Sequence, residues 1–190
     1  MKGFFIDKSE ELCTRPAELL GLLGGKIEDY NWLICDLTGW DSIFARYKDE
    51  ITEVNGAVWV KGSVLAKILR ENRMATANWA VFSAFEPDVI LEKVLGSDLP
   101  ASDFNKTLWF NPVTMLHPLS VIEIVISEIT DISVKCDDQL ILDQFKKTTG
   151  KLSDLEKHNE MFTPPISDPS KAVRTPEPEK KGFFSRLFGN

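Results

Sequence analysis

The chain has 190 residues, of which 43% are hydrophobic, and this size allows one domain with a complete apolar core. Its formal net charge of −7 argues against a nucleic-acid surface, because contacts to phosphates need a clustered excess of lysine and arginine, whereas a basic partner would be attracted. No apolar run reaches the length of about 18 residues that a membrane-spanning helix needs, so we expect no such helix.

The N-terminal part of the chain predicts two strands with a helix between them. Residues 3–6 form a short first strand. Thr14 as an N-cap, Pro16 in the first turn and a run of leucines predict a helix that ends at Gly24. Residues 30–37 are mostly apolar and are bounded by charged residues, which indicates a buried strand.

The next segment, residues 39–53, has the weakest pattern. Trp40, Phe44 and Tyr47 are close to helical spacing, so we expect a short helix or a loop with one helical turn. Together with Arg46 these aromatic residues have the composition of a protein-binding hot spot. A loop packed over the sheet explains the same composition equally well. Trp40, Phe44, Arg46 and Tyr47 are therefore candidate partner-binding residues, with the packed loop as the alternative.

Two further strands and two helices are predicted in the middle of the chain. Residues 57–60 form a strand, and Gly62 opens an amphipathic helix whose apolar stripe faces the core. Residues 79–85 form another strand, followed by a helix over residues 87–96. Residues 108–110 are a short strand that a proline soon ends.

Residues 119–145 carry the clearest pattern in the chain. The segment 119–127 alternates isoleucines and carries almost no charge, which predicts a central strand covered on both faces. A short connection leads to a second strand over residues 132–136. Asp137 or Asp138 then caps a helix, an interpretation that we prefer to a metal site. The whole pattern predicts an α+β fold, a single domain with a mixed, mostly antiparallel sheet and helices packed on it.

The composition changes near the C-terminus. We divide the chain into a globular domain of residues 1–150, a polar, proline-rich linker of residues 151–180 and a tail of residues 181–190. Five of the ten prolines fall between residues 163 and 180, which predicts a stiff, disordered linker. The tail has apolar residues at helical spacing and predicts a short amphipathic helix. Its expected docking residues are Lys180, Lys181, Phe183, Phe184, Arg186, Leu187 and Phe188.

Large apolar side chains on an exposed tether lower solubility, and they are typical of a docking segment. The tail fits a groove of a protein partner as a short helix. It also fits a membrane surface, where the phenylalanines enter the acyl boundary and the cations meet anionic headgroups. In a third interpretation the tail folds back on its own domain or only ends the chain. The sequence leaves these three interpretations open.

Little in the sequence supports catalysis. The two histidines, His117 and His158, are far apart and have no metal-ligand spacing. The three cysteines show no paired spacing, which indicates reduced thiols in a cytoplasmic protein. Cys35 ends a buried strand without a neighbouring histidine to activate it. We expect no catalytic residue, no cofactor and no metal; an enzyme that uses Cys35 or His117 is the remaining alternative.

Several passages together resemble small uncharacterised bacterial α+β proteins, some of which are immunity proteins found beside toxins. The passages are Tyr30-Asn-Trp-Leu-Ile, Lys61-Gly-Ser-Val-Leu-Ala-Lys-Ile-Leu, Trp79-Ala-Val-Phe-Ser-Ala-Phe and residues 131–145. The resemblance covers residues 1–147 and implies a stoichiometric, non-enzymatic inhibitor whose acidic surface complements a basic toxin. The linker and the tail are not part of that pattern.

Our first hypothesis from the sequence is thus a bacterial, cytoplasmic protein-binding domain, immunity-like or an adaptor, with a tethered docking tail. Its expected partner is a protein of basic charge, and no nucleic acid. The alternative is a peripheral protein of the inner membrane that is anchored by the tail.

Overall fold

A computed structural model of the chain describes residues 2–7, 15–102, 111–127, 131–149 and 152–161. The strands in these ranges are β1 Lys2–Asp7, β2 Asn31–Cys35, β3 Ile51–Val54, β4 Ala57–Lys61, β5 Ala80–Phe85, β6 Ile122–Ser127, β7 Asp131–Cys136 and β8 Leu152–Asp154. The α-helices are α2 Pro16–Gly21, α3 Asp41–Phe44, α4 Gly62–Glu71, α5 Leu91–Val94, α7 Gln139–Thr149 and α8 Leu155–Glu160. Two 3-10 helices, η1 Gly24–Asp29 and η2 Ala45–Tyr47, complete the elements.

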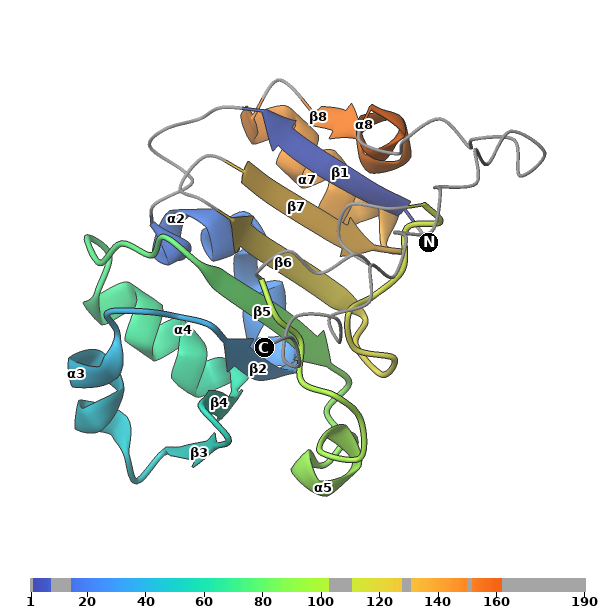
Figure 1. Cartoon of the computed structure of the whole chain (residues 1–190). Helices are drawn as coiled ribbons and strands as arrows, with labels where there is room; N and C mark the ends of the chain where they lie inside the picture. The colour runs from blue at the N-terminus through green and yellow to red at the C-terminus, as the bar shows by residue number, and fades with distance from the viewer. Residues whose placement is uncertain (1, 8–14, 103–110, 128–130, 150–151, 162–190) are drawn as a thin grey trace, which may run out of the picture.

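These strands form a single eight-stranded sheet with the order β3-β4-β2-β5-β6-β7-β1-β8 (Figure 1). Every pairing between neighbouring strands is antiparallel. The α+β class that the sequence predicts is confirmed, and the sheet is antiparallel throughout rather than mixed. β6 has the central position that its apolar pattern predicts, and all of its residues are buried.

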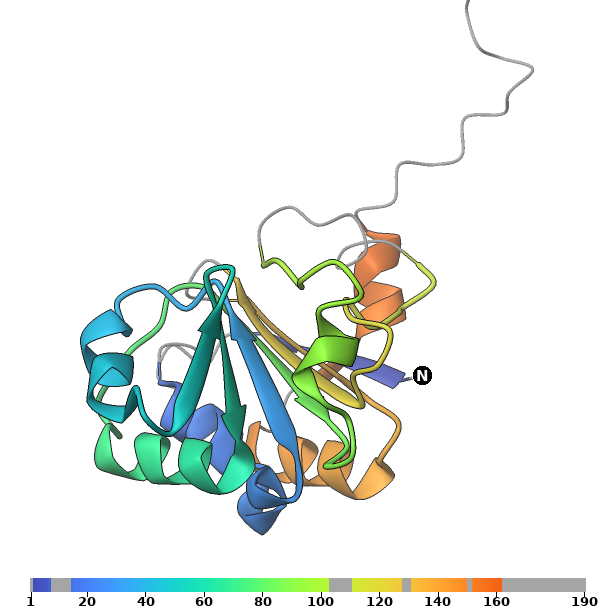
Figure 2. The ribbon, with the colours of Figure 1, turned by 90° about the horizontal axis from the view of Figure 1, so that it is seen from below.

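One face of the sheet carries the main core. Helices α2, α4 and α7 lie in one layer against this face (Figure 2). Trp32, Phe82 and Ile124 face this layer from neighbouring strands, and all three are fully buried. The amphipathic stripe predicted for α4 faces the core through Leu65 and Ile68. Burial of such large side chains contributes about 1.5–3 kcal/mol each, so this face supplies most of the apolar stabilisation.

The opposite face is covered by the long connection between β5 and β6, which contains α5. Leu33, Phe85 and Val125 point from the sheet to this side and pack with Val94 of α5. This smaller cluster explains why β6 is apolar along both faces. The connection therefore closes the sheet on the side that the helix layer leaves open (Figure 2).

A buried ion pair lies within this second face. Glu123 of β6 and Lys135 of β7 stand opposite each other in the sheet register, and both are fully buried. The Lys135 Nζ atom lies 3.4 Å from the Glu123 Oε2 atom and donates a hydrogen bond to the Thr114 carbonyl at 2.8 Å. Burial lowers the pKa of Lys135, because desolvation disfavours its charged form, while Glu123 opposes this effect.

Glu123 also fixes the connection above it. Its carboxylate accepts hydrogen bonds from the amides of Leu116 and His117, at 2.7 and 2.8 Å, and from the Ser120 hydroxyl at 2.8 Å. Hydrogen bonds to a charged acceptor contribute more than neutral ones, about 1.5–3 kcal/mol each. The segment just before β6 is thus held on the sheet by one acidic side chain.

The globular domain extends further than the sequence predicts. β8 pairs with β1, and α8 follows it directly. Leu155 of α8 packs with Phe5 and Val113, and a Cβ atom on Gly3 would lie only 2.8 Å from Leu155. Residues 152–161, which the sequence analysis assigns to the linker, thus pack against the sheet. A three-residue edge strand and a mostly polar helix give too short an apolar pattern to recognise.

Two other local expectations differ from the structure, and two cannot be compared with it. The helix expected over residues 87–96 is reduced to α5, because residues 86–89 form a turn closed by the Val89 amide and the Glu86 carbonyl at 2.9 Å. The edge strand β3 was not predicted at all. Thr14 and the strand expected at residues 108–110 lie outside the described residues.

The cap predicted for the last long helix is confirmed. The Asp138 Oδ1 atom accepts hydrogen bonds from the amides of Leu140 and Ile141, at 2.8 and 3.4 Å. Asp138 also pairs with Lys26 of η1, which holds the pKa of the carboxyl below its usual range. This contact ties the start of α7 to the N-terminal part of the helix layer.

The buried pair makes a first prediction. Glu123→Gln removes the negative charge but keeps the size, so it leaves the Lys135 ammonium buried without a counter-charge. We expect the free energy of unfolding to fall by about 3–5 kcal/mol, as for other broken buried pairs. Urea unfolding of Glu123→Gln, Lys135→Met and the double variant measures the coupling between the two residues. A double variant whose loss equals the sum of the single losses would contradict this assignment.

Candidate functional site

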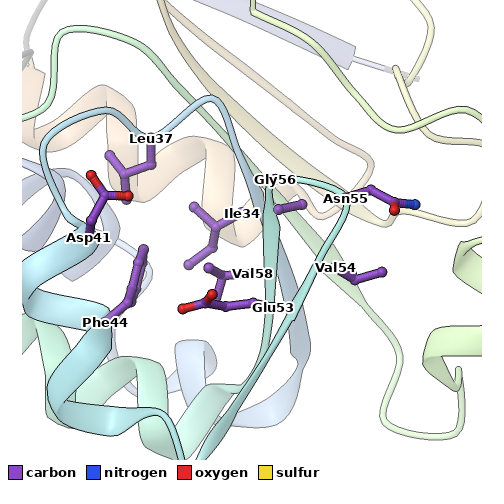
Figure 3. A pocket seen from close by; sticks show the side chains of 10 residues that line it. Ile34, Leu37, Asp41, Phe44, Glu53, Val54, Asn55, Gly56 and Val58 are labelled. Atoms are coloured by element: carbon purple, nitrogen blue, oxygen red, sulfur yellow. The ribbon is translucent and has the colours of Figure 1, made fainter.

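A pocket of about 420 Å³ lies between the β3–β4 hairpin, helix α3 and the end of β2 (Figure 3). Its lining residues are Ile34, Leu37, Asp41, Phe44, Glu53, Val54, Asn55, Gly56, Ala57 and Val58. None of these residues is cationic, and two of them are acidic. The pocket is the candidate functional site, because it combines a buried apolar floor with exposed charge of one sign.

The hairpin side of the pocket is formed by a tight turn. Asn55 and Gly56 have positive φ angles of 50° and 79°, which is typical of a two-residue turn of type I′. The turn places Val54 opposite Ala57 and fixes the register of β3 on β4. Figure 3 shows the Glu53 side chain reaching from this hairpin toward α3.

Trp40 anchors the other side of the pocket. Its side chain is buried, and its indole N–H donates a hydrogen bond to the Thr76 carbonyl at 2.9 Å. Its carbonyl accepts from the amides of Ile43 and Phe44, both at 2.9 Å, and so starts α3. Asp41 is the first residue of this helix and lines the pocket on the α3 side (Figure 3).

The floor and the rim differ in character. Ile34, Phe44 and Val58 are buried and form the apolar floor, whereas Asp41 and Glu53 are exposed at the rim. Within the described ranges, neither carboxylate takes part in a hydrogen bond or an ion pair. Two unpaired carboxylates over an apolar floor suit a ligand that combines a cation with an apolar group, such as an arginine or lysine next to a large side chain.

The four candidate partner-binding residues come together, but three of them are in the core. The exposed fractions of Trp40, Phe44 and Tyr47 are 1%, 5% and 5%. Arg46 is exposed and donates a hydrogen bond to Asn72, while the Tyr47 hydroxyl donates to Glu71. The segment thus matches the packed-loop alternative, and Phe44 meets the pocket as part of its floor. Binding of a partner through this segment stays a prediction.

His117 and Cys35, the alternative catalytic residues, have structural roles. His117 is fully buried, its Nε2–H donates to the Val94 carbonyl at 3.0 Å, and its Nδ1 atom accepts from the Leu119 amide at 3.1 Å. Both ring nitrogens are therefore engaged. Burial raises the pKa of the Cys35 thiol to about 12, so the thiol is protonated at neutral pH.

Other sequence-based expectations have different outcomes. His158 stacks on Phe5 with ring centroids 3.8 Å apart. In the part of the chain that the structure describes, no cluster of three or more acidic, histidine or cysteine side chains could hold a metal ion. No helix in that part has the length and apolar character needed to cross a membrane. The linker from residue 162 onward and the seven expected docking residues at 180–188 lie outside the described residues, so tail docking stays a prediction.

Comparisons of the chain with protein-family models, with curated proteins and with solved structures found no match. The resemblance to toxin-immunity proteins therefore stays an expectation from the sequence. Function has to be inferred from the pocket and its residues.

Most pocket residues were not predicted from the sequence. Phe44 was named as a candidate, whereas Asp41 and Glu53 were not. The signal that could have located the hairpin is the dipeptide Asn55–Gly56 between two short apolar segments, because this dipeptide is the commonest type I′ turn. Its position would have revealed β3 and, with it, the acidic residue beside α3.

The buried thiols make a prediction for the dependence of stability on pH. Burial raises the pKa of Cys35 to about 12 and that of Cys136 to about 11, from the ordinary thiol value of 9.0. Between pH 9 and 11 the unfolded chain thus binds fewer protons than the folded chain, so the free energy of unfolding falls as pH rises. For each thiol, the free energy of unfolding can fall by at most about 1.4 kcal/mol per pH unit.

Urea unfolding at about pH 8 and about pH 10 tests this sign. Cys35→Ala should show a shallower decline than the unsubstituted chain, whatever its absolute stability. An unchanged decline would mean that the Cys35 thiol titrates normally in the folded protein.

Proposed function

We propose that the chain is a non-enzymatic protein-binding protein, immunity-like or an adaptor, whose pocket beside the β3–β4 hairpin takes a basic segment of a protein partner. The observation that carries the proposal is the pair Asp41 and Glu53. These carboxylates come from separate elements, line one apolar pocket and are unpaired within the described residues. A guanidinium or ammonium group can pair with them while its aliphatic stem covers the floor.

The charge of the whole chain supports the same partner chemistry. A formal net charge of −7 attracts a basic protein over long distances and raises its association rate. Arginine and aromatic residues are the side chains that most often dominate the binding energy at an interface. A partner segment with one such cation and a neighbouring apolar residue would satisfy both parts of the pocket.

The location of the pocket gives further support. Within the described sheet β3 is an edge strand that pairs only with β4, so its outer edge offers free backbone donors and acceptors. An extended partner segment can pair with such an edge, a common mode of peptide recognition. Glu53 lies on this strand, so strand addition would bring a partner's side chains beside the acidic rim.

Reversal of the pocket charge tests the proposal. We expect Asp41→Lys/Glu53→Lys to weaken the captured partner's affinity at least about tenfold, which corresponds to about 1.4 kcal/mol, because two attractive contacts become repulsive. The partner is first identified by affinity capture from the native lysate, and its affinity for each variant is then measured by calorimetric titration.

Asp88→Lys/Glu92→Lys is the matched control. It changes the net charge equally at two exposed residues outside the pocket lining. Circular dichroism checks that both variants fold. Equal losses in the two variants would mean that only total charge matters, and no loss in either would remove the pocket from the proposal.

A second candidate function is that of a peripheral protein at the inner membrane, anchored by the tail. The composition of the tail favours it, because Phe183, Phe184, Leu187 and Phe188 stand among cationic residues. In this case the globular domain would act as a regulator close to the membrane surface.

Pelleting with anionic lipid vesicles tests this second function. We expect the full chain to pellet with the vesicles and Phe184→Ser/Phe188→Ser to lose most of this binding, since each phenylalanine contributes buried apolar area. Neutral vesicles are the control for the cations. If the substituted chain pellets as well as the original, the tail is not a membrane anchor.

A further inference from the structure

We infer that the tail of this same chain, with the preceding Lys180, docks in the acidic pocket when no partner is bound. This inference rests on the proposed function, since it assigns the tail as an internal competitor for the partner's site. The segment supplies what the pocket lacks, because Lys180, Lys181 and Arg186 are cations and the pocket lining contains none.

The apolar residues of the tail also match the apolar floor of the pocket. Phe184 and Phe188 are one helical turn apart, so a short helix presents both rings on one face. The pocket floor of Ile34, Phe44 and Val58 offers an aliphatic and aromatic surface for one such ring. Lys180 and Lys181 precede Phe184 by four and three residues, so on the same helix they lie beside its ring, where the acidic rim can pair with them.

The other described pockets fit this segment less well. The groove between α2 and α4 is lined by the carboxylates of Glu18 and Glu28, but Glu18 pairs with Arg15, and Arg70 and Arg73 in the same lining repel a cationic tail. The hollow beside β1 and α7 contains Lys2 and Lys146. The hollow near α5 has a single carboxylate, Asp98, and none of its lining residues is buried. Among the described pockets, the one at the β3–β4 hairpin combines two carboxylates and a buried apolar floor with a lining that contains no cation.

The chain is long enough to bring the tail to the pocket. α8 follows β8 at one edge of the sheet, and β3 forms the other edge. Eight strands at a spacing of about 4.8 Å span about 34 Å between these edges. Residues 162–180 could reach about 59 Å as an extended, proline-rich chain.

The tether makes weak binding sufficient. A linker that can span two sites gives an effective concentration of about 1 mM or more. A tail with an intrinsic Kd near 1 mM would then occupy the pocket about half of the time. A free partner that binds more tightly would displace it. Only a partner that binds more tightly than the tail would thus occupy the pocket. Displacement of the tail would expose the apolar residues of the tail for a second contact.

Paramagnetic relaxation enhancement in the full chain tests the inference. A nitroxide is attached to Ser185→Cys in the tail, and Cys13→Ser removes a cysteine outside the described residues. Cys35 and Cys136 are buried and remain unlabelled. We expect the amide signals of Glu53 and Gly56 to lose at least about half of their intensity. The amide of Gly25, on the far side of the helix layer, should keep its intensity.

The pocket variants decide whether the contact is specific. With the nitroxide in place, Asp41→Lys/Glu53→Lys should restore the hairpin signals, whereas Asp88→Lys/Glu92→Lys should not. A mixture of isotope-labelled chain without nitroxide and unlabelled chain with nitroxide should show no broadening, since the docking is within one chain. Broadening that is absent, uniform, intermolecular or insensitive to the pocket charges would overturn the inference.

The outcomes separate this inference from the proposed function. If broadening at the hairpin is absent while Asp41→Lys/Glu53→Lys still loses the captured partner, the inference fails and the proposed function stands. If broadening occurs as expected but partner affinity is unchanged by the same substitutions, the tail docks in the pocket and the proposed partner site is wrong.

Discussion

The contact between Glu123 and Lys135 is the constraint on which the second half of the fold depends. Taking two charges out of water costs several kcal/mol for each ion, and this cost is offset only if every donor and acceptor has a partner. Here the partners are backbone groups of the connection before β6, including the Leu116 amide and the Thr114 carbonyl. The connection therefore has one position on the sheet, and the apolar face beneath it stays covered.

This arrangement also determines where a function can reside. The residues that usually carry chemistry, His117 and Cys35, are both buried in the same covered face and serve the packing of the connection. On this face Glu123, Lys135 and His117 have hydrogen-bond partners, and the Cys35 thiol is protonated at neutral pH. Two unpaired carboxylates of the described residues, Asp41 and Glu53, line an apolar pocket at the sheet edge. Recognition of another molecule is best placed at this margin.

The sequence predicts elements whose pattern is long and local, and it fails where the pattern is short or depends on pairing. β6 and the Asp138 cap were predicted because alternation and capping act within a few residues. β3 was missed because only four residues form it and the two in the middle are exposed. Glu123 pairs with Lys135 because of the strand register, and the pocket forms because α3 lies beside the β3–β4 hairpin. Neither arrangement can be predicted from a local sequence pattern.

A structural explanation exists for each rim carboxylate alone. Glu53 on an edge strand discourages association of this edge with other chains, and Asp41 in the first turn of α3 complements the positive end of the helix. Neither role requires the two charges to share one pocket, or the pocket to have a buried floor such as Phe44. Edge protection works equally well with a lysine. Two like charges around an apolar hollow thus support the proposed cationic ligand more than a purely structural role.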